Sequence, residues 1–128
     1  MINVTDDRLY TKEHAWARPN GNGCYEIGLS GYAIKELDGI AYVAFETQEN
    51  DMVKKGDIIA SIESRKAVDA LHSPVDGIIK VIASHVETDP TCLENCDGDI
   101  TLAVIQPMDG KVEGLLTREE YDKYTEGL

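Results

Sequence analysis

Runs of hydrophobic residues, some alternating with polar residues and some continuous, predict β-strands along most of this chain. Residues 14–18 and 24–29 flank a turn of alternating asparagine and glycine at 20–23, so we expect them to form an antiparallel hairpin. Residues 40–45 are rich in β-branched and aromatic side chains, which indicates a buried strand. Residues 100–105 predict a strand that completes the sheet.

Helices are predicted at two places among these strands. Ser30 is suited to cap the N-terminus of a short helix that runs to Leu37, and Asp38 and Gly39 should end it. Residues 113–128 place a few hydrophobic side chains among charged ones, which predicts a C-terminal helix packed on the sheet. The pattern as a whole predicts a mainly β fold.

A second predicted hairpin carries a lysine at its tip. Residues 56–62 and 70–79 have the pattern of strands, and Lys66 lies between them. The first strand should have two faces, one with Ile58, Ala60 and Ile62 and the other with Ile59, Ser61 and Glu63. A lysine on a rigid tip is presented to solvent as a modifying enzyme requires, although most turn lysines are simply solvated.

The segment Glu63-Ser64-Arg65-Lys66-Ala67 resembles the lipoyl-attachment hairpin of the glycine cleavage system H proteins, whose motif is Glu-Ser-Val-Lys-Ala. Arg65 replaces the valine. The likeness continues, in the family's order, through residues 9–16, 27–33, 39–43, 53–57 and 115–121. Several motifs in the right order are more specific than one pentapeptide, so the chain is identified as a member of the H-like lipoyl carriers.

This resemblance implies a lipoyl/biotinyl-type hybrid barrel-sandwich of two small sheets with short helices, including a C-terminal helix, in one domain over residues 1–128. It implies lipoate linked to Lys66 as N6-lipoyllysine, within a hairpin formed by Glu63, Ser64, Arg65 and Ala67. Glu63 and Arg65 would be recognition or solvation groups for the lipoate-attaching enzymes. A biotin carrier would share the geometry, but biotinyl lysines usually lie between methionines.

The chemistry of a hairpin lysine agrees with the role of a carrier that is not an enzyme. A lysine amine is nucleophilic only when neutral, and an exposed one is mostly protonated at neutral pH. The sequence offers no buried base beside Lys66, so the attaching enzyme must deprotonate the amine and deliver an activated acyl group. Tethering would then raise the concentration of the dithiolane at each docked partner into roughly the millimolar range.

Departures from the family pattern bear on the cargo of the arm. Ala15 and Ala70 stand where H proteins typically place two carboxylates beside an aminomethyl amine, and a buried ammonium without such partners is costly, on the order of kcal/mol. Asp69 should point to the face opposite Ala70, whereas Glu13 should share the strand face of Ala15 and could substitute. The family's Gly-Trp is replaced at residues 97–100.

These departures favour a lipoyl carrier outside glycine cleavage. By analogy it would be a sulfur carrier in a heterodisulfide-reductase-like system of bacterial sulfur oxidation, with redox or sulfur-transfer enzymes as partners. A glycine cleavage system H protein that carries the aminomethyl group is the first alternative. An unlipoylated scaffold protein is the second.

The composition limits the partners and the cellular location that we expect for the protein. Acidic residues outnumber basic ones 24 to 12, and the formal net charge of −12 argues against nucleic-acid binding. That charge suits docking on basic patches of partner enzymes, or a salty cytoplasm. The longest clearly apolar run, residues 40–45, is too short to span a membrane. We therefore expect a cytoplasmic monomer without a membrane anchor.

The remaining reactive residues are expected to be structural. Three cysteines are too few for a disulfide scaffold, and a zinc site would need more ligands. Cys92 and Cys96 would share a face if residues 90–95 are helical, but ordinary reduced thiols are expected. The single tryptophan, Trp16, is expected to pack in or around the core. The three histidines are scattered, so a shared metal site is not expected.

Overall fold

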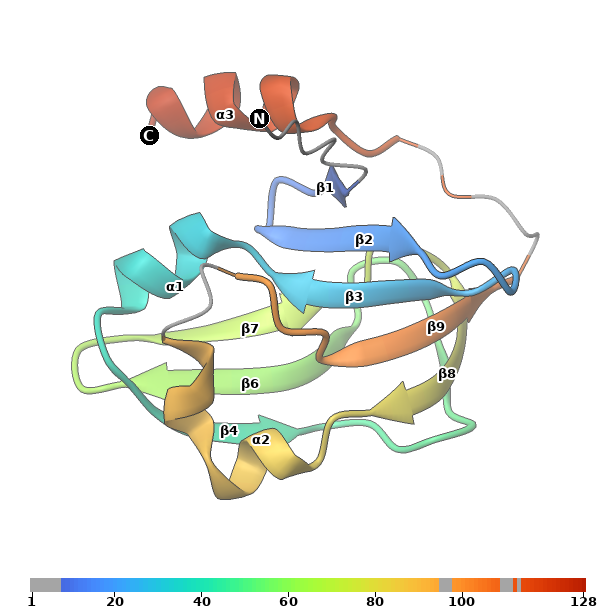
Figure 1. Ribbon diagram of the computed structural model, residues 1–128, viewed down its shortest axis with the longest axis horizontal. Coiled ribbons are helices and arrows are strands. Elements are labelled where there is room, and N and C mark those ends of the chain that lie inside the picture. Colours follow the sequence, from blue (N-terminus) through green and yellow to red (C-terminus); the bar gives the residue numbers. More distant parts are fainter. Residues whose placement is uncertain (1–7, 95–97, 109–111, 113) are drawn as a thin grey trace, which may run out of the picture.

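The computed structural model describes residues 8–94, 98–108, 112 and 114–128, and its strands form two antiparallel sheets (Figure 1). The larger sheet contains, in spatial order, β1 (Leu9–Tyr10), β2 (Ala15–Pro19), β3 (Tyr25–Leu29), β9 (Ala103–Pro107), β8 (Gly77–Ile82) and β5 (Met52–Val53). The smaller sheet contains β4 (Ile40–Phe45), β6 (Ile58–Ser64) and β7 (Val68–His72). The predicted mainly β class with two small sheets is confirmed.

Short helices complete the fold, and the first begins and ends where the sequence predicts. In α1 (Gly31–Leu37), the Ser30 hydroxyl accepts a hydrogen bond from the backbone N–H of Ala33, and Asp38 ends the helix at a φ of 55°. Further along lie α2 (His85–Thr88), the 3₁₀-helix η1 (Pro90–Leu93) and the C-terminal α3 (Arg118–Glu126).

The C-terminal helix is shorter than predicted. The expected span of 113–128 was wrong at its start, because Thr117 caps α3. The Thr117 hydroxyl accepts from the backbone N–H of Glu120, and the Glu120 carboxylate accepts from the backbone N–H of Thr117. Leu116 instead bridges to Tyr10 of β1. This bridge ties the segment before α3 to the edge of the larger sheet, where α3 lies in Figure 1.

The first hairpin is confirmed, with one correction at its start. β2 pairs with β3 from Ala15↔Leu29 to Pro19↔Tyr25. His14 was expected in the strand, but its φ of 72° places it in the left-handed region, in the turn before β2. Glu13 lies in the same turn, so the expectation that it shares the strand face of Ala15 was wrong.

The second hairpin is also confirmed, but two details were wrong. The return strand was expected over residues 70–79, whereas β7 ends at His72 and residues 77–79 belong to β8 of the larger sheet. The alternation along β6 was wrong at one point. A β-bulge interrupts the β6–β7 pairing between Ile58 and Ala60. The extra residue turns Ile59 into the core, where it is fully buried, and leaves Ile58 exposed. Ala60 and Ile62 face the core as expected.

Two further strands differ from their predicted form. β4 has the predicted bounds, but only Ile40 and Val43 are buried, because the smaller sheet keeps one face toward solvent and a bulge follows Ile40. The predicted strand 100–105 is displaced to β9. Its expected first residue, Ile100, precedes the sheet ladder.

Buried side chains of both sheets meet in one hydrophobic core, and a second, aromatic cluster lies beneath α3. Trp16 is fully buried in that second cluster with Tyr10 and Tyr121, so the prediction that Trp16 is a packing residue is confirmed. The Trp16 indole N–H donates to the Gly98 carbonyl at 2.6 Å. A Cβ on Gly28 would overlap the Trp16 ring, so the indole requires a glycine there.

Candidate functional site

Ser64 closes the turn at the tip of the β6–β7 hairpin. Its backbone N–H donates to the Ala67 carbonyl at 2.8 Å. Its hydroxyl accepts from the backbone N–H groups of Lys66 (3.2 Å) and Ala67 (3.1 Å), and donates to the Ala67 carbonyl at 3.3 Å. A single side chain therefore fixes the backbone on both sides of the lysine.

Lys66 projects from this tip into solvent, with 61% of its side chain exposed. Its Nζ lies 3.9 Å from Oδ2 of Asp38, the residue that ends α1. An exposed ion pair is worth at most about 1 kcal/mol, so this contact leaves the amine available. The other four residues of the predicted hairpin lie around it at the tip, with Arg65 and Ala67 exposed and Glu63 and Ser64 half-buried.

A cleft of about 610 Å³ opens beside Lys66. Arg65 and Lys66 form one wall, residues 38–41 form another, and Thr91 and Glu94 close it from η1 and its C-terminus. The Glu94 carboxylate also accepts a hydrogen bond from the backbone N–H of Ile40 at 2.8 Å. The cleft therefore joins the hairpin tip, the end of α1 and η1, and its volume lies in the range of small-molecule sites.

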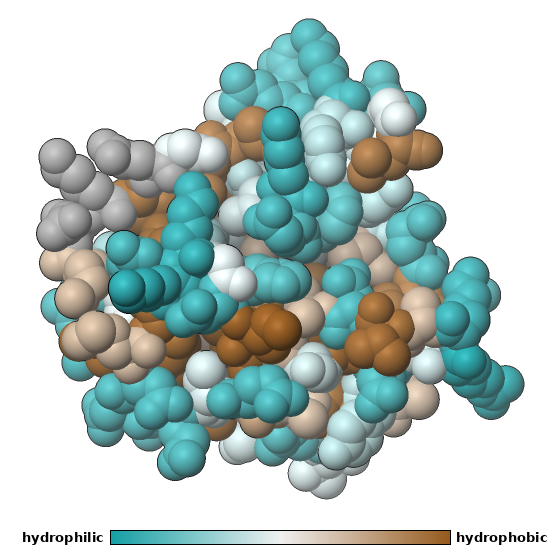
Figure 2. All heavy atoms as spheres, turned by 180° about the vertical axis from the view of Figure 1, so that it is seen from behind, coloured by the Kyte–Doolittle hydropathy of each residue, from teal (hydrophilic) through white to brown (hydrophobic). Residues whose placement is uncertain are grey.

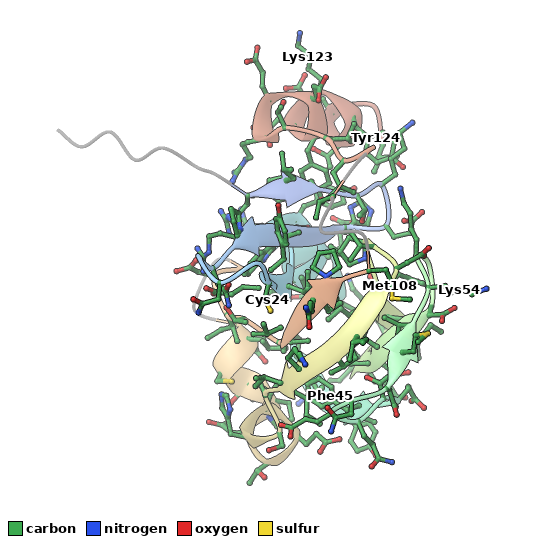
Figure 3. All side chains as sticks on the ribbon, turned by 90° about the vertical axis from the view of Figure 1, so that its right-hand side faces the viewer. Cys24, Phe45, Lys54, Met108, Lys123 and Tyr124 are labelled. Carbon is green, nitrogen blue, oxygen red and sulfur yellow. The ribbon has the colours of Figure 1, made fainter. Side chains whose placement is uncertain are left out.

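The lysine pair at residues 54–55 lies far from this tip. Lys54 and Lys55 precede β6, and Lys66 follows it. β6 is seven residues long, which corresponds to about 23 Å at the rise of an antiparallel strand. Figure 3, which faces the opposite end of the molecule, shows Lys54 projecting at the surface near Met108.

A hydrogen-bonded network joins the turn before β2 to α1 and α3. The Tyr121 hydroxyl lies 2.7 Å from Nδ1 of His14 and 2.7 Å from Oγ of Ser30. The His14 ring also packs at 5.0 Å from the Tyr32 ring, measured between centroids. The partners in this network lie up to 107 residues apart, so no local sequence pattern indicates it.

The surroundings of His14 and Tyr121 both disfavour charge on these side chains. Burial lowers the pKa of His14 from 6.5, and the carboxylates of Asp69, Glu13 and Glu36 oppose part of that effect. Burial raises the pKa of Tyr121 to about 12, partly offset by its hydrogen bond with Ser30. Carboxylates from β7, α1 and the turn before β2 therefore act together on His14.

Comparison with known proteins agrees with this geometry. A family model described as "Glycine cleavage H-protein" matches residues 8–127. The chain belongs to the glycine cleavage H-protein family. This is a family of lipoyl carriers, so the resemblance identified in the sequence is confirmed.

Individual relatives cover nearly the whole chain. A probable glycine cleavage system H protein of Thermococcus gammatolerans is 34% identical over 98% of this chain and 94% of its own length. Glycine cleavage system H protein 4 of Aquifex aeolicus is 36% identical over 94% of this chain and 71% of its own length. The crystal structure of an H protein from Mycobacterium marinum superposes with a TM-score of 0.82 at 27% identity, covering 98% of this chain and 100% of that chain.

Within the H-protein fold, the two alanines at the family's carboxylate positions lie in different environments. Ala15 is fully buried in the main core. Ala70 pairs with Ser61 and lies on the outer face of the smaller sheet, whereas Asp69 pairs with the buried Ile62. Asp69 and Ala70 therefore point to opposite faces, as predicted.

The residues at the tip fit a lipoyl group. Lys66 offers an exposed amine on a closed turn, and the adjacent cleft leaves room beside that amine.

Among the described residues, no cluster of histidine, cysteine and carboxylate side chains is arranged to hold a metal ion. In the same part of the chain, no helix is both long and apolar enough to cross a membrane. Cys92 lies in η1, but Cys96 is outside the described residues, so their predicted common face is not described.

Proposed function

We propose that this chain is a lipoyl carrier in which lipoate is amide-linked to Nζ of Lys66. The observation that carries the proposal is the exposed Lys66 amine on a turn closed by Ser64. When bound, the lipoyl group supplies a dithiolane that interconverts between disulfide and dithiol and can carry a cargo on sulfur. The protein's own contribution is to hold the attachment point in one direction and away from its core.

Attachment requires help from another protein. Nζ must lose a proton before it can attack, and the carboxylate paired with it, that of Asp38, is 3.9 Å away on an exposed side chain. A solvated carboxylate is a weak base toward an ammonium group. Asp38 therefore orients the amine at most, and the attaching enzyme supplies both the base and the activated acyl group.

For the pathway, we place glycine cleavage first. The compared proteins of Thermococcus, Aquifex and Mycobacterium are all named H proteins of that system. Asp69, Glu13 and Glu36 also act on His14, so this part of the surface has carboxylates although residues 15 and 70 do not. The partners would then be the enzymes of glycine cleavage and the lipoate-attaching enzymes.

A sulfur carrier is the second candidate, and one observation favours it. Alanines occupy the two positions at which H proteins typically carry carboxylates, Ala15 in the core and Ala70 on the outer sheet face. Neither position therefore offers a carboxylate to an amine cargo. The proteins compared above lend no support to a role in sulfur oxidation.

The two pathways are separated by an activity assay. Lipoylated protein is mixed with the glycine decarboxylase and aminomethyltransferase of a glycine-cleaving organism, and release of carbon dioxide from glycine is followed. Glycine cleavage predicts turnover that disappears in a Lys66→Arg variant and persists in Lys54→Arg. Lipoylated protein that gives no turnover, beside an active H protein as a positive control, would exclude glycine cleavage and leave the sulfur carrier.

A further inference from the structure

Three side chains form a row across the smaller sheet immediately below the hairpin tip. Tyr42 of β4 is the cross-strand partner of Glu63 of β6, and Glu63 is the partner of Val68 of β7. Directly opposed residues in antiparallel strands point to the same face. The row crosses all three strands of the smaller sheet, with Glu63 three residues before Lys66 and Val68 two residues after it.

This row lies on the face that points away from the core. Ile62, the neighbour of Glu63 along β6, is fully buried, so Glu63 and its cross-strand partners face solvent. Val68 is 70% exposed and Tyr42 is 53% exposed. The next row on this face consists of the small residues Ala44, Ser61 and Ala70. Tyr42 and Val68 thus lie on either side of Glu63, and the neighbouring row on the same face has only short side chains.

Exposed apolar side chains beside a modification site suggest a contact surface. A single exposed valine or tyrosine needs no explanation, but two in register beside the only lysine at the tip form a patch with a defined position. Figure 2 shows hydrophobic side chains in separate groups on an otherwise largely hydrophilic rear surface. Apolar groups concentrated next to Lys66 would be covered whenever a protein encloses the tip.

The charges on this face indicate the chemistry of the partner. Glu63 lies in the row, and the Glu46 carboxylate accepts a hydrogen bond from Ser61 Oγ at 3.1 Å in the row behind. The chain as a whole carries a formal charge of −12. A partner that covers this face must therefore present an apolar patch bordered by basic side chains.

The opposite side of the tip faces the protein itself across the cleft described above. There the cleft is lined by residues 38–41, Thr91 and Glu94, and Asp38 lies 3.9 Å from the Lys66 amine. The inner face of the hairpin packs on the core through Ile62 and Leu71. An enzyme that grips the tip firmly enough to react with Nζ therefore has the outer face as its open support.

We propose that Tyr42, Glu63 and Val68 form the docking surface for the enzyme that attaches lipoate to Lys66. The inference rests on the proposed function, because it takes Lys66 as the site of attachment. In the docked complex, neutral Nζ attacks the acyl carbon of a lipoyl adenylate held by the enzyme. The amide bond forms, the bond from the acyl carbon to the phosphate oxygen breaks, AMP leaves, and the proton of Nζ passes to a base of the enzyme.

The test is the kinetics of attachment to the unmodified full-length protein, with a lipoate ligase, lipoate and ATP. Val68→Asp places a charge in the docking surface, and Val81→Asp is the matched control, because Val81 is a strand valine of the larger sheet that is 48% exposed. Val68→Asp should raise KM for the protein about tenfold, as expected for loss of a contact at an interface centre, with little change in kcat. Val81→Asp should stay within about twofold of the native protein, a change expected outside an interface.

Additional variants keep the result interpretable. Val68→Thr preserves the shape of the side chain and serves if Val68→Asp fails to fold, and it should raise KM by a smaller factor. Glu46→Lys should lower kcat/KM and weaken its dependence on salt, because it removes attraction to a basic rim. Equal KM values for folded Val68→Asp and Val81→Asp would overturn the docking surface.

Two other outcomes have distinct meanings. If the native protein is not modified at all by ligases that modify an authentic H protein, the proposed function itself fails. If the native protein forms a dimer that Val68→Asp disrupts while the attachment rate stays unchanged, the surface serves self-association, and the proposed partner is wrong.

Discussion

Removing the Ser64 hydroxyl isolates the part that turn geometry plays in modification. Ser64→Ala deletes the two hydrogen bonds that the hydroxyl accepts from Lys66 and Ala67 and the one that it donates to Ala67. The residue types of the lysine and its other neighbours are unchanged. The variant therefore tests whether the attaching enzyme reads a shaped tip or only a sequence.

The size of the effect follows from the exposure of these bonds. A net contribution of about 0.5–1.5 kcal/mol is typical of one hydrogen bond, and at an exposed turn the freed backbone groups can bond to water, so the low end applies. Three such bonds together stabilise the closed tip by about 1–1.5 kcal/mol. Their loss should lower the equilibrium constant between closed and open tip by about five- to tenfold, and kcat/KM for attachment should fall by up to that factor.

The assay is the initial rate of lipoate attachment at low protein concentration. Ser64→Thr, which keeps a hydroxyl at the same position, is the control and should remain close to the native rate. The melting temperature should change little, because the turn lies at the end of the hairpin and outside the core. Attachment to Ser64→Ala at the native rate would show that a flexible tip suffices and would refute this reasoning.

Two more predictions concern stability. Burial lowers the pKa of His14 in the folded protein, so the unfolded chain binds the proton more tightly, and the free energy of unfolding should fall as the pH drops below about 6.5. His14→Asn, in which asparagine tolerates the positive φ, should flatten this dependence in denaturant titrations at pH 8 and pH 5.5. An unchanged pH dependence in that variant would show that His14 does not cause it. Gly28→Ala should destabilise the protein by about 1–3 kcal/mol in the same titrations, because the new methyl group would overlap the Trp16 ring, and native stability in that variant would show that the indole can shift.

The parts of the fold that follow local rules could be predicted from the sequence. The turn at 20–23 and the Ser30 cap depend on residues a few positions apart, and both are present as expected. The start of α3 also had a local signal, since Thr117 and Glu120 have the spacing of a capping box. The predicted helix begins too early because it counts Leu115 and Leu116 as part of its hydrophobic face.

Other features depended on distant contacts. Ile58 and Ile59 are chemically equivalent, and only the pairing with β7 and the core decides which of them a bulge turns inward. The positive φ of His14 accompanies a hydrogen bond to Tyr121 at the other end of the chain. The tip residues 63–67 were correctly placed together because a hairpin is local. The cleft beside them was not foreseen, because it needs residues 38–41 and η1.

The most direct test of the account is the modification state of Lys66 in protein isolated from its native cells. The purified protein would be digested, and the peptide that contains Lys66 would be sequenced by mass spectrometry alongside the peptide that contains Lys54 and Lys55. We expect one lipoyl group on Lys66 and unmodified lysines at 54 and 55. An unmodified Lys66, in cells where other lipoyl proteins are fully modified, would show that Lys66 is not the attachment site.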